Sequence, residues 1–197
     1  GAHAEEASAK ERVIGVQGKG VPKAEVRSTG TDAASPGGAG YRFSVSNGEA
    51  SVPAVVVGGT PWQMGWQIGH LLKEEINRFV PAVVAGFKSQ MALDDAELDR
   101  VWSTTAAFTD DRFEQELGGL AAGCGLPLRT LQHAHCLPLL MPYSCSSIAA
   151  WGAATADGHL YQTRNLDWSL EAGAHLFPAL VVYLPDQGQA HALPTFA

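Results

Sequence analysis

Residues 144–168 read SCSSIAAWGAATADGHLYQTRNLDW, and the pattern within them indicates an antiparallel pair of strands. Residues 145–152 have the composition of a strand. The Ala-Asp-Gly sequence at 156–158 is a hairpin turn signal, and residues 159–165 then predict the returning strand. The sequence therefore predicts a β-hairpin in this segment.

Such a hairpin would bring three reactive groups to one end of the strand pair. Cys145 begins the first strand, and Arg164 and Asp167 return beside it. A thiol is nucleophilic only as the thiolate, which a nearby cation favours. A covalent mechanism also needs a base near the nucleophile, and no histidine occupies an obvious position. The α-amine of Cys145 could serve once the Ser144–Cys145 bond is cut, with the Asp167 carboxylate orienting it.

The overall composition excludes several classes of protein. The chain has 197 residues and is 46% hydrophobic, enough for one or two domains with a core. The net charge is -7 and no basic run occurs, so we expect no nucleic-acid partner. No apolar stretch reaches the roughly 18 residues that indicate a membrane span.

The cysteine count is odd, which argues against a disulfide framework. Cys124 and Cys136 lie in apolar surroundings without a reactive pattern, and we interpret both as core thiols. Cys145 is then the candidate for a reactive thiol, although a buried structural role remains the alternative for it.

The composition divides the chain into three parts. Residues 1–40, rich in Ala, Gly, Ser, Lys and Glu, are expected to form a flexible lead-in. Residues 41–144 are expected to be mostly helical, and residues 145–197 to form β-structure. Ala2-x-Ala4 fits the left side of a signal-peptidase site, which favours a periplasmic or secreted protein. The same N-terminal residues could equally be a remnant of cloning, in which case a cytoplasmic protein is expected.

Two strands and a helix are expected at the start of the second part. Residues 41–46 and 54–57 have strand character, and Asn47-Gly48 between them is a turn signal. Thr60 is a good helix N-cap before an apolar pattern of helical period. We expect Pro81 to kink or end this helix.

Three further helices follow in the sequence. One should begin near 93–95 and another near 110–111, the latter ending at Gly123 or Gly125. The last should open at Pro127 and end before Pro138. After the hairpin, residues 179–184 and those from Gln189 onward predict two more strands. Because strands with apolar faces need a covering layer, we expect a further portion beyond Ala197, or another chain, to complete the domain.

Three ordered blocks of this sequence resemble one known family. They are GTPWQMGWQIGHLL at 59–72, ELGGLAAG at 116–123, and the pattern CSSI…ADG…RNLDW at 145–168. Together they resemble the acyl-coenzyme A:isopenicillin N acyltransferase family of N-terminal-nucleophile (Ntn) cysteine hydrolases. Penicillin V acylase and bile salt hydrolase are more distant cousins. The resemblance covers about residues 41–197.

The resemblance implies an α+β fold, the αββα sandwich of Ntn hydrolases, of which this chain would hold only the first strands. It implies autoproteolysis between Ser144 and Cys145, giving an α-chain of residues 1–144 and an incomplete β-chain from 145. Arg164 and Asp167 would act with the Cys145 nucleophile.

Asn165 and Ser146 are expected to have supporting roles. Oxyanion-hole groups would lie beyond Ala197.

The implied reaction acts on the amide or thioester bond of an N-acyl amino compound or small peptide. An acyl group forms a thioester on Cys145 and passes to water in hydrolysis, or to an amine in acyl transfer. No metal or organic cofactor is implied.

This sequence departs from the family pattern at two positions. Many relatives have Gly where this chain has Ser144, and Thr where it has Ser146. A non-catalytic or unprocessed relative that acts as a binding or scaffold protein is therefore the alternative. A cut after Ala197, which would make the whole chain an α-chain, is another.

Other interpretations of the same residues remain open. His133-x-His135-Cys136 with Cys145 could suggest a metal site, but the spacing fits no standard zinc pattern, and residues two apart on a helix point different ways. His135 could pair with Cys145 as in papain-like enzymes, although that family's local signature is absent. Arg164 and Asp167 could form an ordinary ion pair.

Overall fold

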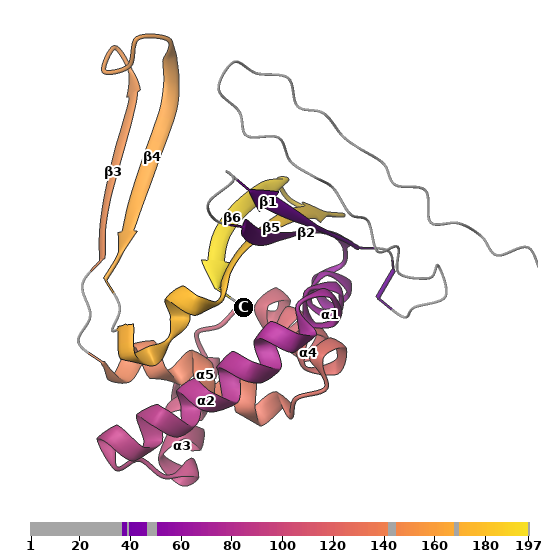
Figure 1. Cartoon of the computed structure of the whole chain (residues 1–197), viewed down its shortest axis with the longest axis vertical. Helices are drawn as coiled ribbons and strands as arrows, with labels where there is room; N and C mark the ends of the chain where they lie inside the picture. Colours follow the sequence, from indigo (N-terminus) through magenta and orange to yellow (C-terminus); the bar gives the residue numbers. More distant parts are fainter. Residues whose placement is uncertain (1–36, 39, 47–50, 142–144, 168–169, 197) are drawn as a thin grey trace, which may run out of the picture.

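The computed structural model describes residues 37–38, 40–46, 51–141, 145–167 and 170–196. In this part of the chain five α-helices and two β-sheets form an α+β fold, as expected (Figure 1). The strands are β1 (Tyr41–Ser46), β2 (Ser51–Gly59), β3 (Cys145–Gly152), β4 (Gly158–Leu166), β5 (Pro178–Pro185) and β6 (His191–Phe196). The helices are α1 (Pro61–Leu71), α2 (Lys73–Met91), α3 (Asp95–Ala106), α4 (Asp111–Cys124) and α5 (Leu128–Leu140).

The larger sheet joins strands from both sides of the helical block. Its order is β1-β2-β5-β6, with β2 and β5 parallel and the outer pairs antiparallel. The register places Val55 opposite Val181, and both side chains are buried. The helices lie on one side of this sheet (Figure 1), so that its inner face closes the hydrophobic core.

Glycines set the distance between α1 and α4. Gly65 and Gly69 in α1 face α4, while Gly119 and Gly123 in α4 face α1. A Cβ atom on Gly119 would lie only 2.0 Å from the carbonyl oxygen of Trp62. The two helix backbones therefore touch, and the sequence blocks 59–72 and 116–123 meet in space.

A buried glutamine joins α1 to the sheet. Gln67 is 2% exposed, and its amide group pairs with both backbone groups of Gly58 at the end of β2. Its Oε1 accepts from the Gly58 N–H at 2.9 Å, and its Nε2 donates to the Gly58 carbonyl at 2.8 Å. Nε2 also donates to the carbonyl of Gly37. One side chain thus fixes three backbone groups that belong to different segments.

Several predicted helix ends are confirmed. Thr60 caps α1 in a reciprocal box with Gln63, in which each side chain bonds the other residue's backbone N–H. Gly125 ends α4 in the left-handed conformation, with φ of 80°. These ends follow from local chemistry, because a cap needs only residues within one turn.

The prediction that a helix ends before Pro138 is wrong, and of the two expectations for Pro81, a kink or an end, the helix end is wrong. The first helix already stops at Leu71, and α2 continues through Pro81 to Met91. Likewise α5 contains Pro138 and ends at Leu140. A proline inside a helix costs about 3 kcal/mol. In α2 this cost is offset because six large apolar side chains are buried, at about 1.5–3 kcal/mol each, namely Ile76, Phe79, Val80, Val83, Val84 and Phe87.

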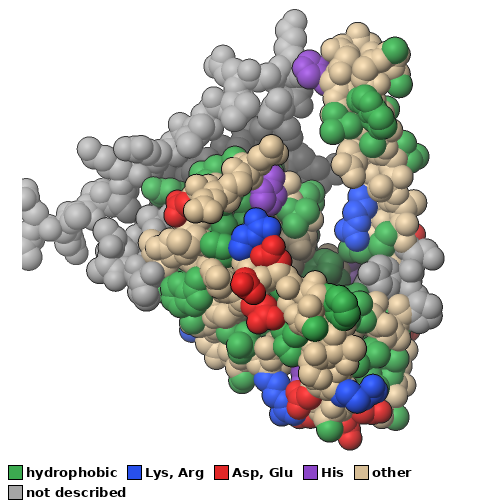
Figure 2. All heavy atoms as spheres, turned by 180° about the vertical axis from the view of Figure 1, so that it is seen from behind, with side chains coloured by type: hydrophobic (Ala, Val, Ile, Leu, Met, Phe, Trp, Pro, Cys, Tyr) green, Lys and Arg blue, Asp and Glu red, His purple; other side chains and the backbone are tan. Residues whose placement is uncertain are grey.

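The predicted hairpin is confirmed as a separate two-stranded sheet. β3 pairs with β4 from Cys145 opposite Leu166 to Gly152 opposite Gly158. In both views it stands away from the helical body as an arm (Figures 1 and 2). Large apolar side chains remain exposed along it, including Ile148 at 70%, Trp151 at 63% and Leu160 at 65%.

Some expectations fall on residues outside the described part. These are the lead-in through residue 36 with its Ala2-x-Ala4 pattern, the Asn47-Gly48 turn, Ser144 and Trp168.

Candidate functional site

The candidate nucleophile lies at the first position of the arm. Cys145 begins β3 and is exposed. Arg164 on β4 donates a hydrogen bond from Nη2 to the Cys145 Sγ, with 3.6 Å between the two atoms. The register explains this contact, because Arg164 lies opposite Ser147, two residues from Cys145 on the same face. A long side chain can reach such a diagonal neighbour.

The carboxylate of Asp167 has a different partner. Asn165 donates from Nδ2 to Asp167 Oδ1 at 2.5 Å. Asn165 lies directly opposite Ser146 in the ladder, so the two supporting candidates are cross-strand neighbours. The structure therefore brings Cys145 and Arg164 into contact and places the Asp167–Asn165 pair at the same end of the hairpin.

This arrangement supplies a nucleophile and a cation in contact with it. The guanidinium carries a fixed positive charge beside the sulfur, so it stabilises negative charge that develops there. Arg164 also presents donors that could bind a substrate carboxylate. A covalent reaction at the Cys145 sulfur would also need a base close to it. That base would be the free α-amine of Cys145 or a group outside the described residues.

The other two cysteines are core thiols, as predicted. Cys124 and Cys136 are both fully buried. Their Sγ atoms donate to the carbonyls of Ala121 and Leu98, at 3.7 and 3.6 Å. Burial raises the pKa of both thiols, which disfavours the reactive thiolate. Cys145 is therefore the exposed member of the three.

The two histidines of the His-x-His pattern point to different surroundings. The buried His133 lies with Nε2 2.8 Å from Asp99 Oδ1. The ring of His135 instead packs edge-on against Phe113, with 5.1 Å between the ring centroids. Within the described residues, no group of three or more His, Cys, Asp or Glu side chains could hold a metal ion.

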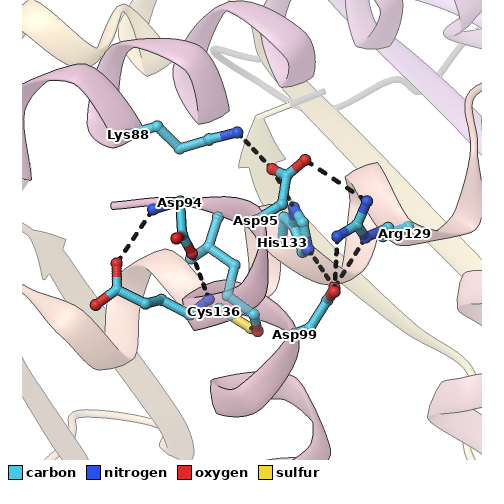
Figure 3. Close-up of polar contacts among 9 residues, drawn as sticks. Lys88, Asp94, Asp95, Asp99, Arg129, His133 and Cys136 are labelled. Carbon is cyan, nitrogen blue, oxygen red and sulfur yellow. Dashed lines mark hydrogen bonds and ion pairs between the residues drawn. The ribbon is translucent and has the colours of Figure 1, made fainter. Parts of the chain in front are cut away.

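A charged cluster joins α2, α3 and α5 (Figure 3). Sequence reasoning missed it. Lys88 pairs with Asp95, while Arg129 and His133 both contact Asp99. Hydrogen bonds from Arg129 and then His133 hold the pKa of Asp99 well below its ordinary value.

The cluster borders a cavity of about 250 Å³. Its charges satisfy one another, which is typical of a structural role. Asp95 and Asp99 are four residues apart and so lie on one face of a helix. This spacing is the sequence feature that could have indicated the cluster.

The described helices give no support to a membrane span, because none of them is both long enough and apolar enough to cross one.

Comparison with known proteins gives two relatives and no family match. No protein-family model matches the chain. It is 36% identical over 151 residues to Protein dcd1B of Dictyostelium discoideum, an alignment that covers 66% of this chain and 30% of that protein. It is 29% identical over 155 residues to Protein dcd1A of the same organism, covering 67% and 35%. The chain thus spans about a third of the length of these curated relatives, and their names state no activity.

Proposed function

We propose that this chain belongs to a self-processing Ntn cysteine amidohydrolase or acyltransferase in which Cys145 is the nucleophile. The contact between Arg164 and the exposed Cys145 thiol is the observation that carries the proposal. Burial of the other two cysteines supports it, since they are poor candidates for the same role.

The first step of the proposed chemistry is self-cleavage. The Cys145 sulfur attacks the carbonyl carbon of Ser144, the peptide C–N bond breaks, and the nitrogen takes the thiol proton. The resulting thioester is opened by water. This step leaves a carboxylate on Ser144 and both a free thiol and a free α-amine on Cys145.

Turnover then uses the new amine as a general base. It takes the thiol proton as sulfur attacks the carbonyl of an N-acyl amino compound or small peptide. The leaving amine accepts that proton, and an acyl-thioester remains on Cys145. Water completes hydrolysis, or an acceptor amine completes acyl transfer. Arg164 would hold the sulfur in place, and Asp167, bound to Asn165, would contribute negative charge near the amine.

The proposal includes an Ntn sandwich formed with a further part of the polypeptide. A lone two-stranded hairpin is marginally stable in water, yet β3–β4 exposes large apolar side chains on both faces. The relatives are about three times as long as the matched segment, which leaves room for more strands and a helical layer. Such strands would cover the arm and supply the oxyanion hole.

The deciding experiment is the intact mass of the complete natural polypeptide that contains this chain, for wild type and Cys145→Ala. Two fragments that meet at Ser144 and Cys145 in the wild type, and one chain in the variant, are expected. Cys124→Ala is the matched control and should still be cut. A cut in Cys145→Ala, or a cut at another bond, would show that Cys145 is not the processing nucleophile.

A binding or scaffold role is the second candidate. It is favoured by the Asp167 carboxylate, whose described partner is Asn165 rather than the thiol, and by Ser144 before the cysteine. In this case an activated ester such as p-nitrophenyl acetate would acylate Cys145 no faster than a free thiol of a denatured chain. Rapid acylation of Cys145 would exclude the scaffold role.

A further inference from the structure

A row of three ionisable side chains joins α4 to the edge of the larger sheet. The hydroxyl of Tyr183 on β5 donates to Glu116 Oε1 on α4 at 3.1 Å. His191 on β6 is the cross-strand partner of Tyr183, and the two rings stack with 4.8 Å between centroids and 11° between planes. The imidazole is held by its Nδ1, which lies 2.9 Å from the carbonyl of Gln189.

The surroundings of the Glu116 carboxyl group disfavour its ionised form. Burial raises the pKa of Glu116 above its ordinary value, and the Tyr183 hydrogen bond and the nearby His191 offset only part of this effect. Burial, followed by the neighbouring Glu116, also raises the pKa of Tyr183, which therefore stays a neutral donor.

On its opposite side α4 packs against α1. There α1 presents Gly65, where a Cβ atom would lie 1.9 Å from the Glu116 carbonyl oxygen. Tyr183 and His191 are therefore the titratable groups that the described residues place against Glu116.

We propose that Glu116, Tyr183 and His191 form a pH-sensitive latch that holds α4 against the β5–β6 edge more firmly at mildly acidic pH than at neutral pH. The latch uses none of the groups at Cys145. A result that contradicts the latch would therefore leave the proposed enzyme activity unaffected, and the reverse is also true.

The direction of the effect follows from proton linkage. A carboxyl whose pKa is higher in the folded state than in the unfolded state binds a proton more tightly when folded. Its contribution to stability is fully present below the unfolded pKa and is lost as the pH rises through the folded pKa. At neutral pH the ionised Glu116 therefore weakens the contact, and protonation restores it.

The test is thermal unfolding of the 197-residue chain from pH 4.5 to 7.5. Glu116→Gln keeps the shape of the side chain and cannot ionise. We expect it to raise the unfolding midpoint by about 2–4 °C at pH 7.5 and to flatten the pH dependence. Glu74→Gln, at an exposed position on α2, is the matched control and should retain the wild-type pH dependence.

Two further variants test the neighbours. Tyr183→Phe removes a hydrogen bond that favours the ionised carboxylate, so the pH-dependent step should move to higher pH. His191→Asn removes the electrostatic contribution of His191 that lowers the pKa of Glu116, so it should move the step in the same direction.

Amide hydrogen exchange, corrected for intrinsic rates, gives a local readout. Protection of residues 113–120 and 183–193 should increase from pH 7.5 to pH 5 in the wild type and not in Glu116→Gln. Equal pH dependence of the wild type and Glu116→Gln in both measurements would overturn the latch. So would exchange that changes equally throughout α3, because a local latch cannot produce it.

Discussion

The guanidinium of Arg164 lies 3.6 Å from the sulfur of Cys145, although 19 residues separate them in the chain. The hairpin creates this contact by itself, since β3 and β4 pair with each other and with no other described strand. The thiol and its cation are therefore brought into contact by the hairpin alone.

We expect iodoacetamide to modify Cys145 in the folded chain while Cys124 and Cys136 stay protected, because only Cys145 is exposed. Arg164→Gln should slow this alkylation at pH 7 several-fold, since it removes the charge beside the sulfur. Mass spectrometry of peptides after timed labelling gives the rates. Arg100→Gln, on the surface of α3, is the control and should leave the rate unchanged. An unchanged rate in Arg164→Gln would mean that the contact has no influence on reactivity.

Gly119→Ala should destabilise the fold by about 1–3 kcal/mol or more, because a buried Cβ there would overlap the Trp62 carbonyl. Gly86→Ala is its matched control. It lies at an exposed position within α2, where a Cβ would meet nothing within 4 Å. That change should stabilise the chain by about 0.5–1 kcal/mol through helix propensity. Urea unfolding of both variants measures the difference, and equal effects would contradict the close contact of α1 with α4.

Gln67→Leu should be strongly destabilising although leucine is of similar size. The change leaves the Gly58 N–H and C=O and the Gly37 C=O without the partner that Gln67 provides, and an unsatisfied polar group costs about 1–3 kcal/mol when it is fully buried. Gln115→Leu, at an exposed position of α4, is the control and should have little effect. Chemical unfolding compares the two. A loss no greater than in the control would show that water replaces the amide.

Asp99→Asn should alter the acid sensitivity of the helical block. The pKa of Asp99 is lowered by Arg129, so its carboxylate contributes stability above the unfolded pKa that is lost as the pH falls toward the folded value. The difference in unfolding midpoint between wild type and Asp99→Asn should therefore be constant near pH 6 and shrink between about pH 4 and pH 2. Asp186→Asn, on an exposed turn, should show no such trend. A difference that does not change with pH would rule out this contribution.

Much of the fold could be predicted because its signals are local. Thr60 and Gly125 mark helix ends through hydrogen bonds within one turn, and the short connection of residues 153–157 joins β3 to β4 as a hairpin. The Cys145–Arg164 contact was predictable for the same reason, since a hairpin register follows from its turn.

The failures of prediction have a common cause in burial. Pro81 was expected to kink or end a helix, and α2 continues through it because the residues around it are packed into the core. The polar partners Glu116 and Tyr183, which are 67 residues apart, gave no pattern that could be recognised. Their contact depends on how α4 lies on the sheet.

The sequence by itself determined the positions of most helices and strands, the caps at Thr60 and Gly125, and the hairpin that pairs the thiol with the guanidinium, because each of these depends on residues close together in the chain. Only the tertiary structure decided that β2 pairs in parallel with β5, that glycines bring α1 and α4 into backbone contact, and that Glu116 lies half-buried beside Tyr183. These relationships depend on which segments, far apart in the sequence, bury the most apolar area when they pack together. A short sequence pattern contains no information about that packing.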